Sequence, residues 1–193
     1  MAWLGLLFLK TMGWRVEGKI PNIKKFVIIA APHTSNWDFL LGILFVTRHG
    51  IGLRWVGKDS LFRWPLKWFF LKLGGLPINR REPTGAIRKL ADSFAQNEKL
   101  TICIAPEGTR AKGDHWRTGF YRLAQEATVP VGLGFFDYHR KCVGIERWVS
   151  LSGDEEADLA LFRSYYADKA ALYPEKAGDI CFRDRKRNIP LGS

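Results

Sequence analysis

The sequence has few of the residue patterns that identify several common protein classes. It contains three cysteines among 193 residues, at positions 103, 142 and 181, and no Cys-x-x-Cys pair. Their wide separation argues against a zinc site, and their odd number argues against a disulfide framework, so we expect reduced thiols. The sequence also lacks a Gly-x-Ser-x-Gly segment. This absence argues against a hydrolase with a serine nucleophile.

Long apolar runs are missing as well. The first nine residues are mostly apolar, but Lys10 ends the run, whereas a helix that spans a bilayer needs about 20 residues. The segment also lacks the charged region and cleavage site of a secretory signal. We therefore expect residues 1–18 to form a short amphipathic segment that docks in the membrane interface, with Trp3 and Trp14 near basic residues. A buried first helix is the alternative.

What the sequence has in excess is positive charge and aromatic side chains. Thirty Lys and Arg against nineteen Asp and Glu give a formal net charge of +11, and there are eight Trp and thirteen Phe. Such a surface attracts anionic lipid, an acidic carrier protein or nucleic acid. No helix-turn-helix, zinc or ribonucleoprotein signature is present, so no nucleic acid is expected.

Residues 61–72 concentrate both features, because Trp and Phe alternate there with Arg63, Lys67 and Lys72. We expect this segment, together with residues 1–9, to rest on an anionic membrane surface. A core helix whose three cations face water is the alternative. A non-enzymatic basic domain that binds membrane or nucleic acid would account for the same composition.

Short apolar runs alternate with helical patterns along the chain. We predict strands at residues 26–30, 53–56, 100–104, 129–136 and 142–151, the last at an edge, and helices at 38–46, 84–96, 119–127 and 154–173. This alternation predicts one α/β domain over residues 1–193, with a mainly parallel sheet flanked by helices. Reactive residues of such sheets gather beyond the carboxyl ends of strands. That rule selects the loops after residues 30 and 104.

The first loop contains a histidine and a carboxylate. His33 and Asp38 are separated by four residues, and Ser35 or Asn36 can cap the helix that follows. If His33 lies in the loop and Asp38 in the first helical turn, the carboxylate can orient the imidazole as a general base. Alternatively, His33 has a packing role and Asp38 is a helix-start charge.

The second loop and two further stretches supply donors for an anion. Residues 106–110 read Pro-Glu-Gly-Thr-Arg, so that Arg110 presents a planar fork of N–H groups after a tight turn. Arg80 and Arg81 follow Gly74-Gly75 and a short apolar run, and Lys58 could add another cation. Solvated surface arginines are the alternative.

Together these loops resemble the glycerolipid, or lysophospholipid, acyltransferase family, whose prototype is 1-acyl-glycerol-3-phosphate acyltransferase. The family's His-x4-Asp motif is matched by His33 to Asp38, its Gly-to-Arg motif by Gly75 to Arg80, and its Pro-Glu-Gly-Thr-Arg motif by Pro106 to Arg110. The resemblance spans residues 26–136, which we take as the motif-bearing core. Two positions depart from the family pattern: Pro32 precedes the histidine, and residues 129–133 read Val-Pro-Val-Gly-Leu without the second proline.

The resemblance implies a single acyltransferase domain at the cytoplasmic face of a membrane, peripheral or monotopic. It implies that the acceptor hydroxyl attacks an acyl thioester directly, with no metal or cofactor. The acceptor would be a lysophospholipid, most simply 1-acyl-glycerol-3-phosphate or else another lysolipid such as a lyso-aminolipid. The donor would be acyl-CoA or acyl carrier protein. The resemblance implies that His33 is the general base and that Asp38 orients it. The residues that it implies bind substrate are Lys58, Arg80, Glu107, Gly108, Thr109 and Arg110.

Overall fold

The structure is a computed structural model that describes residues 7, 9–79 and 83–183. Its elements, in chain order, are β1 (Arg15–Gly18), β2 (Lys25–Ala31), α2 (Asn36–Arg48), β3 (Leu53–Lys58), the 3-10 turn η1 (Asp59–Leu61), α3 (Lys67–Lys72), β4 (Gly75–Ile78), α4 (Pro83–Gln96), β5 (Leu100–Ile104), α5 (Gly119–Glu126), β6 (Val131–Asp137), β7 (Cys142–Val149), α6 (Glu155–Tyr166) and η2 (Pro174–Lys176). Among the described residues, no helix is long and apolar enough to cross a membrane.

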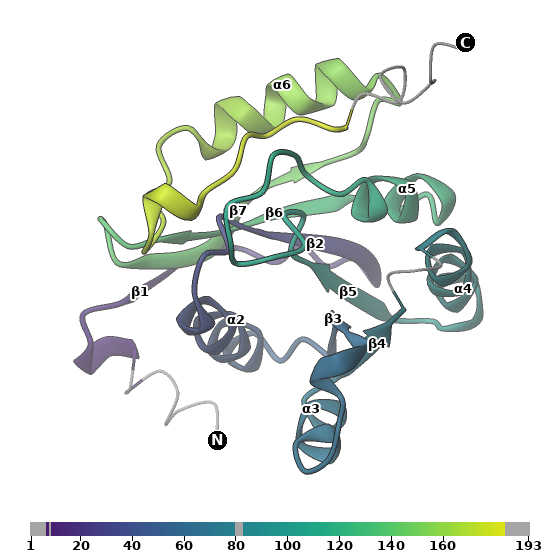
Figure 1. Ribbon diagram of the computed structural model, residues 1–193, viewed down its shortest axis with the longest axis horizontal. Coiled ribbons are helices and arrows are strands. Elements are labelled where there is room, and N and C mark those ends of the chain that lie inside the picture. The colour runs from purple at the N-terminus through teal and green to yellow at the C-terminus, as the bar shows by residue number, and fades with distance from the viewer. Residues whose placement is uncertain (1–6, 8, 80–82, 184–193) are drawn as a thin grey trace, which may run out of the picture.

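A single seven-stranded sheet organises the chain, in the order β1-β7-β6-β2-β5-β3-β4. Every pairing in the described sheet is parallel except β6 with β7, which is antiparallel. Helix α2 covers one face, and α4, α5 and α6 cover the other (Figure 1). The predicted mainly parallel α/β sheet flanked by helices is therefore confirmed.

Strand β2 shows why the central strands read as continuous apolar runs. Val27, Ile29 and Ala31 point into the core shared with α4, α5 and α6. Phe26 and Ile28, which alternate with them, point into the core shared with α2. Since successive side chains face opposite sides of a strand, both faces must be apolar when both are covered.

The topology places three strand ends at one edge of the sheet. Strand β2 is parallel to both of its neighbours, β5 and β6. Their carboxyl ends, at residues 31, 104 and 137, therefore lie side by side. Strand β3, which is parallel to β5, ends at Lys58 on the same edge.

The described part of the expected interfacial segment, residues 1–18, packs partly into the fold. Leu9 and Trp14 are buried against α2 and the sheet, while Leu7 and Met12 are exposed. Arg15–Gly18 is an edge strand paired with β7. The docking expectation for residues 1–6 and 8 falls outside the described residues. The edge position expected for residues 142–151 is wrong, because β1 covers the outer side of β7.

Candidate functional site at the carboxyl edge of the sheet

Asp38 is the centre of the site and is fully buried. Ser35 caps α2, and Asp38 occupies the third helical position, where its side chain completes a capping box. Its Oδ2 accepts hydrogen bonds from the backbone N–H groups of Thr34 and Ser35, at 2.8 and 2.7 Å. The local sequence thus fixes the carboxylate through the same contacts that start the helix.

His33 lies in the loop before α2, with its imidazole directed at this carboxylate. Its Nδ1 is 3.2 Å from Oδ2 of Asp38, and 17% of the His33 side chain is exposed. The Asp38 carboxylate is therefore hidden from solvent while the histidine remains accessible to a ligand. This arrangement can hold an imidazole in one orientation, as a general base requires.

Glu107 joins the two predicted loops. The Oε1 atom of Glu107 accepts a hydrogen bond from the backbone N–H of His33 at 2.9 Å, which ties the loop after β5 to the loop after β2. Burial raises the pKa of Glu107 to about 7, although the hydrogen bond from His33 opposes the rise. Among the described residues, its Oε2 is a buried atom without a hydrogen-bond partner, so this carboxyl can still bind a polar group.

The remaining residues of the Pro-Glu-Gly-Thr-Arg segment serve different purposes. Gly108 adopts a positive φ of 66°, and a Cβ there would lie 3.1 Å from Cγ of Arg117. This turn therefore favours glycine for its conformation. Thr109 and Arg110 are exposed beyond the turn, and Oγ1 of Thr109 accepts a hydrogen bond from Ala111 at 3.1 Å.

The structure brings only part of the predicted site together by direct contact. His33, Asp38 and Glu107 form one connected group, whereas Lys58 and Arg110 are exposed on the same edge of the sheet. Arg80, and Arg81 beside it, lie outside the described residues. Among the described residues, no group of three or more His, Cys, Asp or Glu side chains is arranged to hold a metal ion.

Tyr138 is a site residue that the sequence reasoning missed. Its hydroxyl donates a hydrogen bond of 2.6 Å to Oδ1 of Asp38, so both carboxylate oxygens are engaged. Burial and the adjacent Asp38 raise the pKa of Tyr138 far above its ordinary value, and the hydroxyl stays a donor. Because Tyr138 directly follows β6, the strand-end rule would have found it had it been applied to the third parallel strand.

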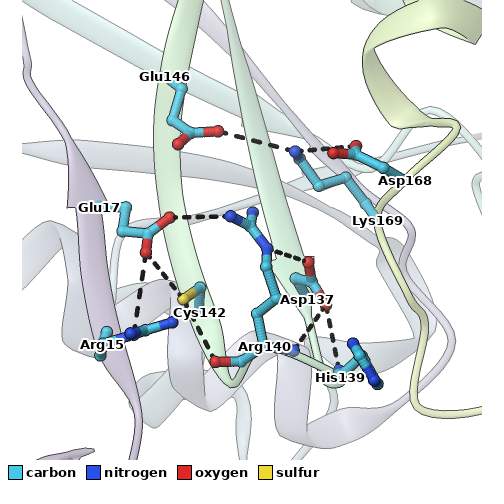
Figure 2. Close-up of polar contacts among 9 residues, drawn as sticks. All are labelled: Arg15, Glu17, Asp137, His139, Arg140, Cys142, Glu146, Asp168 and Lys169. Atoms are coloured by element: carbon cyan, nitrogen blue, oxygen red, sulfur yellow. Dashed lines mark hydrogen bonds and ion pairs between the residues drawn. The ribbon is translucent and has the colours of Figure 1, made fainter.

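The turn that carries Tyr138 is held by a charged cluster, shown in Figure 2. Arg140 donates to Asp137 at 2.6 Å and lies 3.5 Å from Glu17 of β1. Burial alone would raise the pKa of Asp137, but the Arg140 guanidinium and its backbone N–H hold that pKa below its usual value. The β6–β7 turn is thus anchored to the edge strand β1.

The segment after α6 also makes contacts at this site. The backbone N–H of Tyr138 donates to the carbonyl of Ala170 at 2.9 Å, and that of Tyr173 donates to Oγ1 of Thr34 at 3.3 Å. Lys169 bonds Asp168 at 2.9 Å and lies 3.7 Å from Glu146 of β7 (Figure 2). One segment therefore contacts both the Tyr138 turn and the His33 loop.

Comparison with known families assigns most of this chain. The Acyltransferase family model matches residues 14–132, well over half of the chain and every motif described above. The chain belongs to the acyltransferase family. The predicted family resemblance and acyltransferase domain are thereby confirmed.

Individual relatives of this acyltransferase-family chain are distant. A 1-acyl-sn-glycerol-3-phosphate acyltransferase of Streptococcus pneumoniae (strain ATCC BAA-255 / R6) is 24% identical over an alignment of 109 residues, and the match covers 52% of this chain and 41% of that protein. The match thus spans less than half of the relative's length. A sugar kinase structure from Janibacter sp. HTCC2649 covers 84% of this chain and 87% of its own at 14% identity, but its TM-score of 0.24 is too low to indicate a shared fold.

Proposed function

We propose that this protein transfers a fatty acyl group from a thioester donor to the hydroxyl of a lysophospholipid, with 1-acyl-glycerol-3-phosphate as the acceptor. The observation that carries the proposal is the contact between Nδ1 of His33 and the fully buried carboxylate of Asp38, at 3.2 Å. A proton held on Nδ1 by this carboxylate leaves Nε2 free to accept another proton.

The proposed reaction proceeds by direct attack. The acceptor oxygen forms a bond to the thioester carbonyl carbon while Nε2 of His33 takes the hydroxyl proton. The C–S bond then breaks, and the imidazolium returns the proton to the departing thiolate. Acyl-CoA and acyl carrier protein both present such a thioester, and both are cytoplasmic donors. We therefore place the reaction at the cytoplasmic face of the membrane.

The cations near the site support an acceptor with a phosphate monoester. Lys58 and Arg110 lie on the same edge of the sheet as His33, beyond neighbouring strands. Arg80 of the Gly-to-Arg motif is proposed to add a planar fork that binds two phosphate oxygens. The unpartnered Oε2 of Glu107 suits a hydroxyl of the acceptor. The name of the pneumococcal relative agrees with this choice of acceptor.

An assay with purified protein, labelled acyl-CoA or acyl carrier protein, and a panel of lysolipids tests the proposal. The His33→Ala protein should keep its circular dichroism spectrum while kcat falls by about 10²- to 10⁴-fold, as for a lost general base. A folded His33→Ala protein with near-normal turnover would refute the mechanism. If a lyso-aminolipid proves the better acceptor, only the acceptor assignment fails.

A further inference from the structure

The segment that contains η1 and α3 is the most exposed apolar surface in the described part of the chain. Trp64 and Trp68 are 86% and 74% exposed. Leu61, Leu66 and Phe69 are exposed beside them, at 37%, 54% and 57%. Isolated surface apolar residues are common, but these five lie within nine consecutive positions, and clustered exposed apolar residues mark interaction sites.

The opposite side of the same segment is anchored in the body of the protein. The ring of Phe70 lies 6.4 Å from that of Phe39 in α2 and 5.8 Å from that of Trp55 in β3. The ring of Phe62 lies 5.6 Å from that of Trp55. The segment is therefore not simply unpacked: one side packs against the body of the protein, and the other side is exposed to solvent. Figure 1 shows α3 projecting from the sheet beyond β3 and β4.

Cations are interspersed among the bare aromatics. Arg63, Lys67 and Lys72 are all exposed, and Nζ of Lys67 lies 5.9 Å from the centre of the Trp68 ring. From residue 60 to residue 79 the sequence contains no Asp or Glu. Indole rings with adjacent cations suit the boundary between acyl chains and anionic headgroups.

We propose that the surface formed by residues 61–72 docks this protein on an anionic lipid bilayer. An acidic carrier protein could pair with the three cations, but it would leave five large apolar side chains without an apolar environment. A bilayer satisfies both sets at once. The docking surface follows directly after Lys58, at the edge of the sheet where His33 lies. A docked protein therefore holds its site near the membrane surface.

Flotation of the full-length protein with vesicles tests this proposal. Vesicles of phosphatidylcholine alone and of phosphatidylcholine mixed with phosphatidylglycerol are used at low and high salt. The wild-type protein should partition more strongly onto the mixed vesicles, and salt should weaken that preference. A Trp64→Ser, Trp68→Ser double variant should lose about 10-fold or more in partitioning onto both kinds of vesicle.

A charge-reversal variant separates the electrostatic part. Arg63→Glu with Lys67→Glu should weaken partitioning about 10-fold or more on the mixed vesicles, and much less on phosphatidylcholine. The matched controls are Lys89→Glu, an exposed cation of α4, and Ile23→Ser, an exposed apolar residue before β2. Both controls should float as the wild type does.

Two results would overturn the proposal. One is equal flotation of the wild type and the Trp64→Ser, Trp68→Ser protein. The other is unchanged flotation of the surface variants combined with lost binding to acyl carrier protein, which would make the surface a protein-binding site. Vesicle binding is measured without donor or acceptor, so its failure is distinguishable from failure of the proposed acyl transfer.

Discussion

Removal of the Tyr138 hydroxyl tests whether Asp38 acts through its fixed position. In the Tyr138→Phe protein, Asp38 loses its 2.6 Å bond at Oδ1 but keeps the backbone bonds at 2.8 and 2.7 Å on Oδ2. The helix cap and the loop thus stay in place. What changes is the restraint on rotation of the carboxylate beneath His33.

The size of the effect follows from the kind of bond that is lost. A hydrogen bond to a charged group contributes about 1.5–3 kcal/mol, and each ~1.4 kcal/mol in the activation barrier changes a rate tenfold. If the whole loss falls on the transition state, kcat decreases by about 10- to 100-fold. Tyr138 is half-buried, which favours the lower end. The KM values for donor and acceptor should change little, because the hydroxyl is already occupied by Asp38.

The assay is steady-state acyl transfer with urea denaturation measured in parallel. Tyr165→Phe is the matched control, since the Tyr165 hydroxyl donates to the neutral carbonyl of Leu133 at 3.0 Å, a partner outside the His33–Asp38 pair. Both variants should lose a modest amount of stability, but only Tyr138→Phe should lose kcat. If kcat of Tyr138→Phe stays within about twofold of the wild type, well inside the loss expected from this bond, the positioning role is refuted.

Two further predictions concern the anion and the buried glutamate. Arg80→Ala should weaken use of 1-acyl-glycerol-3-phosphate far more than binding of the acyl donor, and Arg80→Lys should restore use of this acceptor only in part, because lysine keeps the charge but lacks the planar fork of donors. Competition between lysophosphatidic acid, lysophosphatidylcholine and a lyso-aminolipid checks this prediction. Preferential use of a lysolipid without a phosphate monoester would contradict it. Burial raises the pKa of Glu107 to about 7, so the folded protein binds more protons than the unfolded one above about pH 4, and its stability decreases as pH rises through about 7. Since glutamine does not titrate, the free energy of unfolding of Glu107→Gln relative to the wild type should increase by roughly 2 kcal/mol between pH 5 and pH 8 in urea titrations; an unchanged difference would show that Glu107 is not buried as an acid.

The central strands and the position of the two candidate loops at strand ends were predictable because the information is local. Continuous apolar runs identify β2 and β5 to within two residues, and parallel neighbours must share an edge. Ser35 and Asn36 both offered a cap for α2, and either would place Asp38 in the first turn; the structure shows Ser35 as the cap. The contact between His33 and Asp38 then requires no information from distant parts of the chain.

The missed features depend on distant partners. Strands β1 and β4 have four residues each, and β4 contains Pro77, which a sheet accepts at an edge but which weakens a strand prediction. The apolar pattern around Leu9 fits a membrane and a protein core equally well, and only the fold shows that the core covers it. Tyr138 lies 100 positions from Asp38; the strand-end rule indicates the same edge of the sheet, but no local pattern pairs this hydroxyl with that carboxylate.

The contacts that Tyr138 and Tyr173 make at the His33 loop have a practical consequence for truncated versions of this protein. The family match ends at residue 132, inside β6, so a fragment with that boundary would contain every motif residue. It would nevertheless lack the hydroxyl that holds Oδ1 of Asp38 and the backbone donor that reaches Thr34 from Tyr173. The segment that contains all the motif residues is therefore shorter than the segment that we expect to support activity. Any shortened version intended for activity should extend through residue 173 at least.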